Sequence, residues 1–509
     1  MNLRFVPTPL AASIEWPAER DGGFADAIGA ACIAAPGVET SLARLHQPGT
    51  LAVTTGQQPG LFTGPLYTVY KALSAAALAA SLEARWRRAV VPVFWLAADD
   101  HDFAEAAEAS WLDSDGELHT VRLRERPADA PLTPMYRERL GPDVEPVLAA
   151  LEAALPPSEF RDSTVSWLRR HYRADTSIAA ASGGALAELL APLGVVCLDA
   201  SHLAVKRAAA GHLIRALGLT RELVRDLSNR LVDLRERGVD PGVNIGDGAS
   251  LVMLEGKAGR DRLVVEDGAF VTRRGRERFD LAALQTVAAE TPERLSPNVL
   301  LRPVIESALL PTVAYVAGPG ELRYLALTPP VYERMRVPRQ TPVPRWSGLI
   351  VEPRVDRVLE KFGARLEELL EPGGRLEARV ARDQLPEDAR GALAAAREAL
   401  EREYGILERA AAGIDPTMQK TVQSTRNQAL GGLADLEKRL VQALRRRQET
   451  ELRQITRART ALQPGGKPQE RVLTLAPFLA RYGPELLASL LAEVRRWYDA
   501  ALEGRGGPA

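Results

Sequence analysis

Short apolar runs alternate with longer segments of helical periodicity through the first two thirds of the chain. The runs cover residues 51–55, 90–97, 194–199 and 312–317. Nearly continuous runs of Val, Leu and Ala of this length are typical of strands buried on both faces of a parallel sheet. Because helical segments separate them, they predict an α/β fold with a doubly wound core.

A different pattern begins near residue 354, where Glu, Arg, Ala and Leu dominate. Two apolar stripes run here at helical spacing: Leu393, Ala396, Leu400, Tyr404 and Leu407, then Leu433, Leu436 and Leu440. Asp415-Pro416 separates them, as an N-cap residue followed by a proline at a helix start. Two helices joined by a tight break fold back on each other, so we expect an antiparallel coiled coil. The narrow stripes favour packing against a second subunit.

Two segments interrupt the alternation of strands and helices in the core. Residues 123–165 are rich in Pro, Asp and Glu, and residues 240–280 hold three short apolar runs divided by Gly-rich turns. The second pattern predicts a small antiparallel insertion of hairpins.

These patterns divide the chain into a core, two insertions and an arm. The last segment is apolar enough over residues 471–502 to return to the core, so the coiled coil is inserted and not appended. The expected parts are the core (1–122, 166–239 and 281–353), the first insertion (123–165), the β-rich second insertion (240–280), the coiled-coil arm (354–466) and the C-terminal return (467–509).

Composition narrows the class of protein. A chain of 509 residues with 46% apolar and 26% charged residues predicts a soluble protein of several domains. The formal charge of -1 gives no argument for a nucleic-acid or membrane partner. Cys32 and Cys197 form no C-x-x-C, which excludes a disulfide framework or a Cys-rich zinc site and favours a reducing, cytoplasmic setting. No apolar run approaches the ~18 residues of a membrane span, and the first ten residues lack a signal-peptide core.

A glycine-rich segment, residues 56–64, lies between the first apolar run and a helical pattern. Its glycines let the backbone approach a ligand, and a helix N-terminus offers free N–H groups. The segment matches neither a P-loop nor a G-x-G-x-x-G fingerprint, and a tight turn without a ligand is the alternative. The candidate substrate contacts are Gly56, Gln57, Gln58, Thr63, Gly64 and Tyr67.

The second apolar run ends in Asp99-Asp100-His101-Asp102. Ligands of open α/β sheets bind beyond the carboxyl ends of the strands, where carboxylates and an imidazole can orient an amine, transfer protons or hold a divalent cation. We take His101, Asp102 and Asp100 as catalytic candidates and Asp99 as a substrate contact. The alternative is that an aspartate caps the following helix. We expect no tightly bound metal, although D-x-D resembles a metal motif of sugar-nucleotide transferases.

The fourth apolar run leads into Gly318-Pro319-Gly320-Glu321, which repeats the plan of a strand, glycines and a helix start. Gly318, Gly320 and Glu321 are therefore candidate substrate contacts. Upstream, Asn298, Arg302 and Glu306 share a four-residue spacing that predicts one helix face, unless Pro303 breaks the helix. Arg302 could pair with a substrate carboxylate; the alternative is an ordinary Arg–Glu pair.

Four segments together resemble a known family, the bacillithiol biosynthesis cysteine-adding enzymes, which are cysteine ligases. The segments are TGQQPGLFTGPLYTVYK (55–71), VPVFWLAADDHDFAE (91–105), NVLLRPVIESALLPTVAYVAGPGELRY (298–324) and ERVLTLAPFLARYGP (470–484). The resemblance covers nearly the whole chain.

The resemblance implies a Rossmann-like core with two connecting-peptide insertions and an inserted coiled coil that mediates homodimerisation. It also implies a reaction, in which the carboxyl group of L-cysteine is joined to the amine of glucosaminyl malate. The likeness of such cores to class I aminoacyl-tRNA synthetases suggests that ATP activates the carboxylate. In that scheme Thr63 and Gly64 serve phosphate binding, His101 and Asp102 orient and deprotonate the amine, and Arg302 binds malate.

The chain departs from the synthetase pattern in two respects. It has no K-M-S-K-S-like loop, and residues 56–66 contain no histidine. A nucleotide, ATP or ADP with or without Mg²⁺, could instead lie between core and coiled coil, near Tyr482 and Gly483. Two other functions fit the residues: a Mg²⁺-dependent nucleotidyl or glycosyl transferase using Asp100 and Asp102, and a non-catalytic coiled-coil dimer that binds a small anion.

Overall fold

A five-stranded sheet forms the centre of the body of the protein, in the order β13-β12-β2-β3-β6. All four neighbouring pairs are parallel. The computed structural model describes residues 3–9, 14–21, 24, 26–383, 385–447 and 449–503. The strands are β2 (Leu51–Gln57), β3 (Val90–Leu96), β6 (Val196–Asp199), β12 (Thr312–Ala317) and β13 (Thr341–Pro344).

The strand order reverses between β2 and β12, because β3 and β6 follow β2 on one side while β12 and β13 lie on the other. This reversal is the switch point of a doubly wound sheet, where a crevice opens at the carboxyl ends of the strands. The predicted α/β fold is thus confirmed, as are its four strands. The fifth, β13, carries Pro342 and Pro344 and was not predicted; an edge strand tolerates the missing N–H donors.

Each face of the sheet is covered by helices, and β3 shows how its sequence serves both. Val90, Phe94 and Leu96 join the core on one side, with α2 (Leu66–Trp86) and α6 (Ile178–Leu190). Val91, Val93 and Trp95 join the core on the other side, with α7 (Leu203–Gly218) and α10 (Arg302–Leu309). Alternation along a strand sends successive side chains to opposite faces, so a strand apolar at every position must be buried twice.

The C-terminal helix α20 (Glu485–Leu502) packs along α2, beneath the sheet. The Tyr498 hydroxyl donates to the Pro344 carbonyl over 2.6 Å, and the Ser81 hydroxyl donates to Asp499 over 2.7 Å. The end of the chain therefore completes the core that its first third begins.

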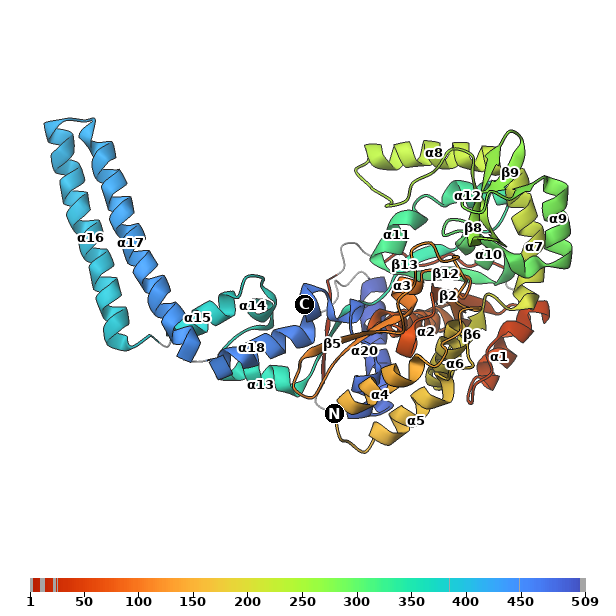
Figure 1. Ribbon diagram of the computed structural model, residues 1–509, viewed down its shortest axis with the longest axis horizontal. Coiled ribbons are helices and arrows are strands. Elements are labelled where there is room, and N and C mark those ends of the chain that lie inside the picture. Colours follow the sequence, from red (N-terminus) through yellow and green to blue (C-terminus); the bar gives the residue numbers. More distant parts are fainter. Residues whose placement is uncertain are drawn as a thin grey trace.

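The second insertion supplies four strands of an antiparallel sheet in the order β10-β9-β8-β7-β11, whose edge strand β11 lies beyond the expected end of the insertion at residue 280. This sheet lies beside α7 and α9 (Leu281–Glu290), as Figure 1 shows. Its strands are β7 (Ala249–Gly256), β8 (Gly259–Glu266), β9 (Ala269–Thr272), β10 (Arg278–Phe279) and β11 (Leu295–Pro297). The first insertion contains α4 (Val144–Ala154), and its expected end at residue 165 is corrected because it falls within α5 (Arg161–His171).

The arm is a hairpin of two long helices that extends far from the body (Figure 1). The hairpin consists of α16 (Glu387–Ile414) and α17 (Met418–Arg447), which pack antiparallel as predicted. It is joined to the body by α13 (Pro353–Lys361), α14 (Leu366–Leu370), α15 (Arg375–Asp383) and α18 (Glu449–Leu462).

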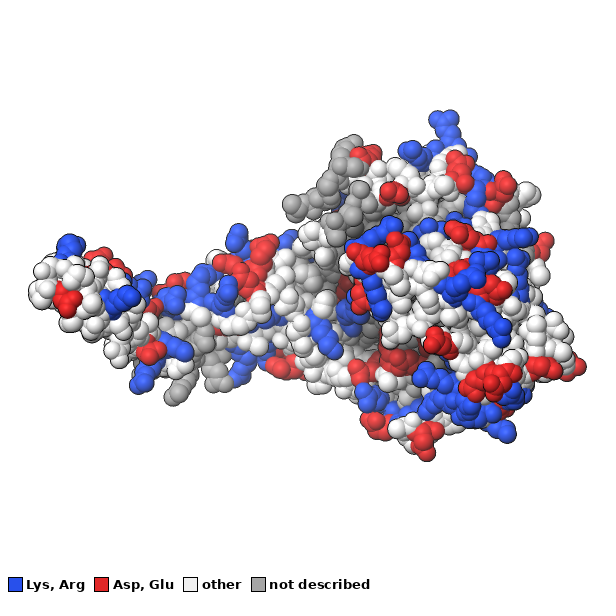
Figure 2. Space-filling model, turned by 90° about the horizontal axis from the view of Figure 1, so that it is seen from above, with Lys and Arg blue, Asp and Glu red and all other residues white. Residues whose placement is uncertain are grey.

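The remaining elements complete the periphery. Lys/Arg and Asp/Glu side chains intermingle over the face of the body shown in Figure 2. Among the described helices, none has both the length and the apolarity to cross a bilayer. The remaining peripheral strands and helices are β1 (Arg4–Pro7), β4 (Glu108–Leu112), β5 (Leu118–Arg122), β14 (Gly348–Val351), α1 (Glu39–Leu45), α3 (Phe103–Ala106), α8 (Thr220–Glu236), α11 (Pro319–Leu325), α12 (Pro329–Met335) and α19 (Ala476–Tyr482).

The packing on α2 leads to a stability prediction. Leu78 is 0% exposed within the core around α2, so Leu78→Ala should lower the free energy of unfolding by about 2–5 kcal/mol through lost burial and a new cavity. Urea unfolding followed by circular dichroism measures the loss. Val232→Ala, on the exposed side of α8, is the control and should change stability by less than about 0.5 kcal/mol. Equal losses in the two variants would contradict a core centred on α2.

Candidate functional site

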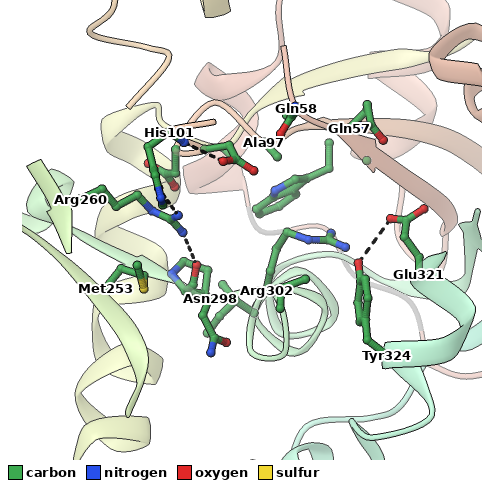
Figure 3. Close-up of a pocket in the computed structure, with 18 of the residues that line it drawn as sticks. Gln57, Gln58, Ala97, His101, Met253, Arg260, Asn298, Arg302, Glu321 and Tyr324 are labelled. Carbon is green, nitrogen blue, oxygen red and sulfur yellow. Dashed lines mark hydrogen bonds between the residues drawn. The ribbon is translucent and has the colours of Figure 1, made fainter. Parts of the chain in front are cut away.

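A cavity of about 520 Å³ opens at the carboxyl ends of β2, β3 and β12. This is the switch point of the sheet. Figure 3 shows side chains that line the cavity. The structure gathers there most of the predicted site residues from three separate segments: Gly56, Gln57, Gln58, Tyr67, Asp99, Asp100, His101, Arg302, Gly318, Gly320 and Glu321.

The floor of the cavity contains a buried ion pair. Lys71, on α2 and 1% exposed, donates from Nζ to Glu321 Oε2 over 2.6 Å and to Gln57 Oε1 over 3.2 Å, and it also donates to the Gly56 carbonyl. Burial lowers the pKa of Lys71, against the pull of Glu321. Burial opposes ionisation of Glu321 too, but Lys71 and Arg302 outweigh it and hold the pKa of Glu321 below its ordinary value.

A second buried pair adjoins the first. Arg302 donates from Nη1 to Glu306 Oε2 over 2.8 Å and from Nη2 to the Tyr315 hydroxyl over 2.9 Å. The Tyr315 hydroxyl donates to Glu321 Oε1 over 2.7 Å, which joins the two pairs. Burial raises the pKa of Glu306, although Arg302 opposes the shift. Arg302 thus lines the cavity with its guanidinium already bound, as the Arg–Glu alternative predicts.

The helix expected to carry Asn298, Arg302 and Glu306 on one face is shorter than that prediction. It begins only at Arg302, and the Asn298 side chain instead accepts from the backbone N–H groups of Leu300 and Leu301, each over 3.0 Å. Asn298 therefore shapes the turn before the helix.

Close packing explains one glycine of the first motif. A Cβ atom on Gly56 would lie 2.9 Å from the Trp95 carbonyl oxygen on β3. Only glycine allows β2 and β3 to remain paired at this point, so the residue is required by the sheet and leaves its carbonyl free for Lys71.

A further lysine, missed by sequence reasoning, holds one of the predicted aspartates. Lys206, on α7 and 2% exposed, donates to Asp99 Oδ1 over 2.6 Å and to the Leu295 carbonyl over 3.0 Å. Only seven of the 65 basic residues in the sequence are lysine, and two of those, Lys71 and Lys206, are buried in this wall. In the sequence, only the rarity of lysine could have marked Lys71 and Lys206 as functional candidates.

The aspartates of the loop after β3 are largely committed to its backbone. Asp100 Oδ1 accepts from the N–H groups of His101 over 2.6 Å and Asp102 over 3.1 Å. Asp102 accepts from Glu105 N–H over 3.2 Å and caps α3. Asp102 does not line the cavity; it lines a neighbouring hollow of about 350 Å³. Its placement as a catalytic residue is therefore corrected in favour of the helix-cap alternative.

Metal binding by this loop has no geometric support. Within the described ranges, no group of three or more His, Cys, Asp and Glu side chains is arranged to hold a metal ion. The carboxylates of Asp100 and Asp102 bind backbone N–H groups, which favours a loop-shaping role over a D-x-D metal site.

His101 meets an arginine from the second insertion, which the sequence did not reveal. Arg260, on β8, lies with Nη1 3.1 Å from His101 Nδ1 (Figure 3). A guanidinium can only donate, so Nδ1 accepts and the proton of the neutral ring is on Nε2. Burial, with Arg260 next, lowers the pKa of His101 and outweighs Asp100 and Asp102.

The charges around the cavity do not cancel. Seven lining side chains are Lys or Arg and four are Asp or Glu. Glu306 and Glu470, which are not among the lining residues, pair with Arg302 and Arg345. Seven cations therefore face six carboxylates, and the surplus is one positive charge. Arg260, Arg262 and Arg471 form no ion pair with a carboxylate among the described residues. The cavity thus presents uncompensated positive charge to a ligand.

Two residues of the first motif lie outside the cavity. Thr63 is 1% exposed, its hydroxyl donates to the Phe62 carbonyl over 2.5 Å, and its N–H donates to the Tyr172 hydroxyl over 2.7 Å. Gly64 follows at φ +74° in a turn packed against Thr68. The assignment of Thr63 and Gly64 to substrate or phosphate is corrected because this half of the loop is turned into the core.

The predicted nucleotide contacts also lie away from the cavity. The Tyr482 hydroxyl donates to Glu352 Oε1 over 2.9 Å. Gly483 ends α19 at φ +69°, where a Cβ atom would lie 2.7 Å from the Phe160 ring. Both residues serve the junction of the C-terminal return with the body.

Comparison with known proteins identifies the family. The family "Bacillithiol biosynthesis BshC, N-terminal Rossmann-like domain" matches residues 30–346, and "Bacillithiol biosynthesis BshC, C-terminal coiled-coil domain" matches residues 348–496.

Relatives named "Putative cysteine ligase BshC" align over most of their length. The protein of Salinibacter ruber is 33% identical over 453 residues, covering 89% of this chain and 82% of the relative. That of Koribacter versatilis is 33% identical over 466 residues, covering 90% and 84%. With both family domains matched in order along one chain, this protein belongs to the BshC family of bacillithiol biosynthesis.

Proposed function

We propose that this protein is a ligase that joins the carboxyl group of L-cysteine to the amine of glucosaminyl malate. The observation that carries the proposal is the cavity at the switch point, whose positive surplus suits two substrates that both bear carboxylates. The shared name of the relatives, a cysteine ligase, supports the reaction class.

The acceptor carboxylates would be met by cations that are not already paired. Arg262 and Arg471 line the cavity. Burial lowers the pKa of Arg262, with Arg273 and Arg260 contributing, so an anion placed beside it would relieve an unfavourable environment. Arg302 would contact the ligand from the floor of the cavity, where hydrogen bonds to Glu306 and Tyr315 hold its guanidinium in place.

Amide formation requires a better leaving group than a carboxylate oxygen. ATP as co-substrate would supply one by converting that oxygen into part of a phosphate anhydride, and a Mg²⁺ ion would come with its phosphates. The uncompensated arginines suit an anionic group of this kind, although the chain has no P-loop. The junction near Tyr482 remains a second proposed position for ATP or ADP.

In this proposal His101 donates a hydrogen bond at the reacting carbon and Asp100 accepts a proton. Because its Nδ1 accepts from Arg260, His101 offers an N–H donor to the oxygen that becomes negative as the amine attacks. Asp100 lines the same cavity. Its Oδ1 is bound to the loop backbone, so its other oxygen, Oδ2, receives the proton that the amine loses. Asp100 therefore takes the role of proton acceptor that the sequence resemblance gave to His101 and Asp102.

We further propose that the arm forms a homodimer. Large apolar side chains on the hairpin are exposed, including Ile406 at 47%, Leu407 at 52% and Leu436 at 50%. Exposed apolar positions along an amphipathic helix favour burial against another subunit.

The function is tested by incubating the purified protein with L-cysteine, glucosaminyl malate and ATP under reducing conditions. Mass spectrometry should detect the amide product, and release of AMP or ADP would identify the activation route. Absence of product from folded protein would favour a non-catalytic anion-binding role. Transfer from a sugar nucleotide, abolished by chelation of Mg²⁺, would favour the transferase.

His101→Ala should lower kcat/KM by about 10²–10³-fold in that assay, which corresponds to loss of one preorganised donor to a developing oxyanion. His119→Ala is the matched control, because His119 lies on β5, is paired with Asp113 and does not line the cavity. Full activity of the His101 variant would exclude the residue from the reaction.

Leu407→Arg combined with Leu436→Arg should convert the dimer to a monomer, since charges replace exposed apolar side chains on both hairpin helices. Size-exclusion chromatography with light scattering measures the mass. Arg402→Glu, an exposed charge substitution on the same hairpin, should leave the dimer intact. A double variant that remains dimeric would place the interface elsewhere.

A further inference from the structure

The two insertions meet next to the loop that carries His101. Leu132, in the first insertion, donates its N–H to the Ala258 carbonyl over 2.9 Å, and its own carbonyl accepts from Arg260 N–H over 2.8 Å. This backbone contact lies at the turn between β7 and β8, one residue before Arg260 on β8.

The contact depends on a glycine. Gly259 has φ +79°, and a Cβ atom there would lie 2.5 Å from backbone atoms of Leu132. Such a distance is impossible for any other residue without displacement of one insertion, so the local chain path requires both the conformation and the small size of glycine.

The first insertion also binds the His101 loop itself. Met135 N–H donates to the Asp100 carbonyl over 2.8 Å, and Tyr136 N–H donates to the Ala98 carbonyl over 3.1 Å. The Tyr136 hydroxyl donates to Glu255 Oε2, on β7, over 2.8 Å. Residues 132–136 thus hold the His101 loop and the β7–β8 hairpin in one arrangement.

The Arg260 guanidinium is fixed at three points. Nε donates to the Ser296 hydroxyl over 2.8 Å, Nη2 donates to the Pro297 carbonyl over 2.7 Å, and Nη1 donates to His101 Nδ1 over 3.1 Å. Figure 3 shows Arg260 and His101 directed toward each other on one wall of the cavity. Every bond of Arg260 is to a neutral acceptor, so its charge is not spent on a carboxylate.

We propose that Arg260 is a positioning residue that locks His101 in the tautomer with its proton on Nε2, so that the ring meets substrate as a hydrogen-bond donor. The functional part of this inference rests on the proposed ligase reaction. The tautomer itself does not, because it follows from the Arg260–His101 contact alone.

The other charged groups near His101 define the expected pH behaviour. Burial, then Arg260 and, more weakly, Arg274 lower the pKa of His101, whereas Asp100 and Asp102 raise it. Loss of Arg260 should therefore raise the pKa toward the ordinary value of 6.5. Neutral His101 persists above its pKa, so the acid limb of kcat/KM should move to higher pH when Arg260 is replaced.

The test is ¹⁵N NMR of histidine-labelled full-length protein, with His101→Gln to assign the signal. In the unmodified protein His101 should show a protonated Nε2 and an unprotonated Nδ1. Arg260→Gln should give mixed tautomers and a higher pKa. Arg260→Lys, whose single ammonium can reach fewer of the three acceptors, should restore the tautomer only in part.

Arg274→Gln is the matched control, because Arg274 contributes charge near His101 while its backbone N–H donates to Asp261. It should shift the pKa without mixing the tautomers. Thermal unfolding of each variant checks that the fold is kept.

A protonated Nδ1 in the unmodified protein, or a tautomer unchanged in Arg260→Gln, would overturn the proposal. These readouts need no turnover, so absence of ligase activity would count against the proposed function and leave the Arg260–His101 result standing. Where activity is present, an acid limb that stays fixed in Arg260→Gln would contradict the positioning role.

Discussion

The buried contact between Lys71 and Glu321 constrains everything around the cavity. Lys71 is held out of water while the Glu321 side chain is 20% exposed, so the lysine needs this carboxylate and its other acceptors. Removing one partner of a fully buried pair typically costs about 3–5 kcal/mol, and this pair should cost less. Lys71 comes from α2 and also binds the end of β2, whereas Glu321 lies in the first turn of α11 after β12. The pair therefore joins the two strands between which the sheet reverses, and it holds the crevice at a defined width.

The walls of that crevice come from different parts of the chain. The central sheet supplies the floor and the loop with His101, while the second insertion supplies Arg260 and Arg262. A loop alone would leave an imidazole free to rotate. Bound on one side by Arg260 and held through its backbone by residues 135–136, the His101 loop has little remaining freedom, which is the condition for preorganised catalysis.

The arm and the body differ in how much of their apolar surface they bury. In the body, the C-terminal helix returns to cover α2, so that few large apolar side chains remain in contact with water. The hairpin is only two helices thick and cannot bury its own stripes, which leaves Leu407 and Leu436 about half exposed. The homodimer proposed above would cover these exposed positions.

The sequence by itself determined four strands of the central sheet, the helical hairpin and most of the segments that form the cavity, because those follow from local periodicity and from glycine and proline placement. It left open which way each side chain faces. Thr63 and Gly64 share a motif with Gln57, yet the turn at positive φ directs them into the core. Asp102 adjoins His101, yet its carboxylate caps a helix. Arg260 lies about 160 residues from its partner, a pairing that no local pattern encodes. Only the tertiary structure decided these, because burial and pairing of charge depend on segments that meet after the sheet has formed.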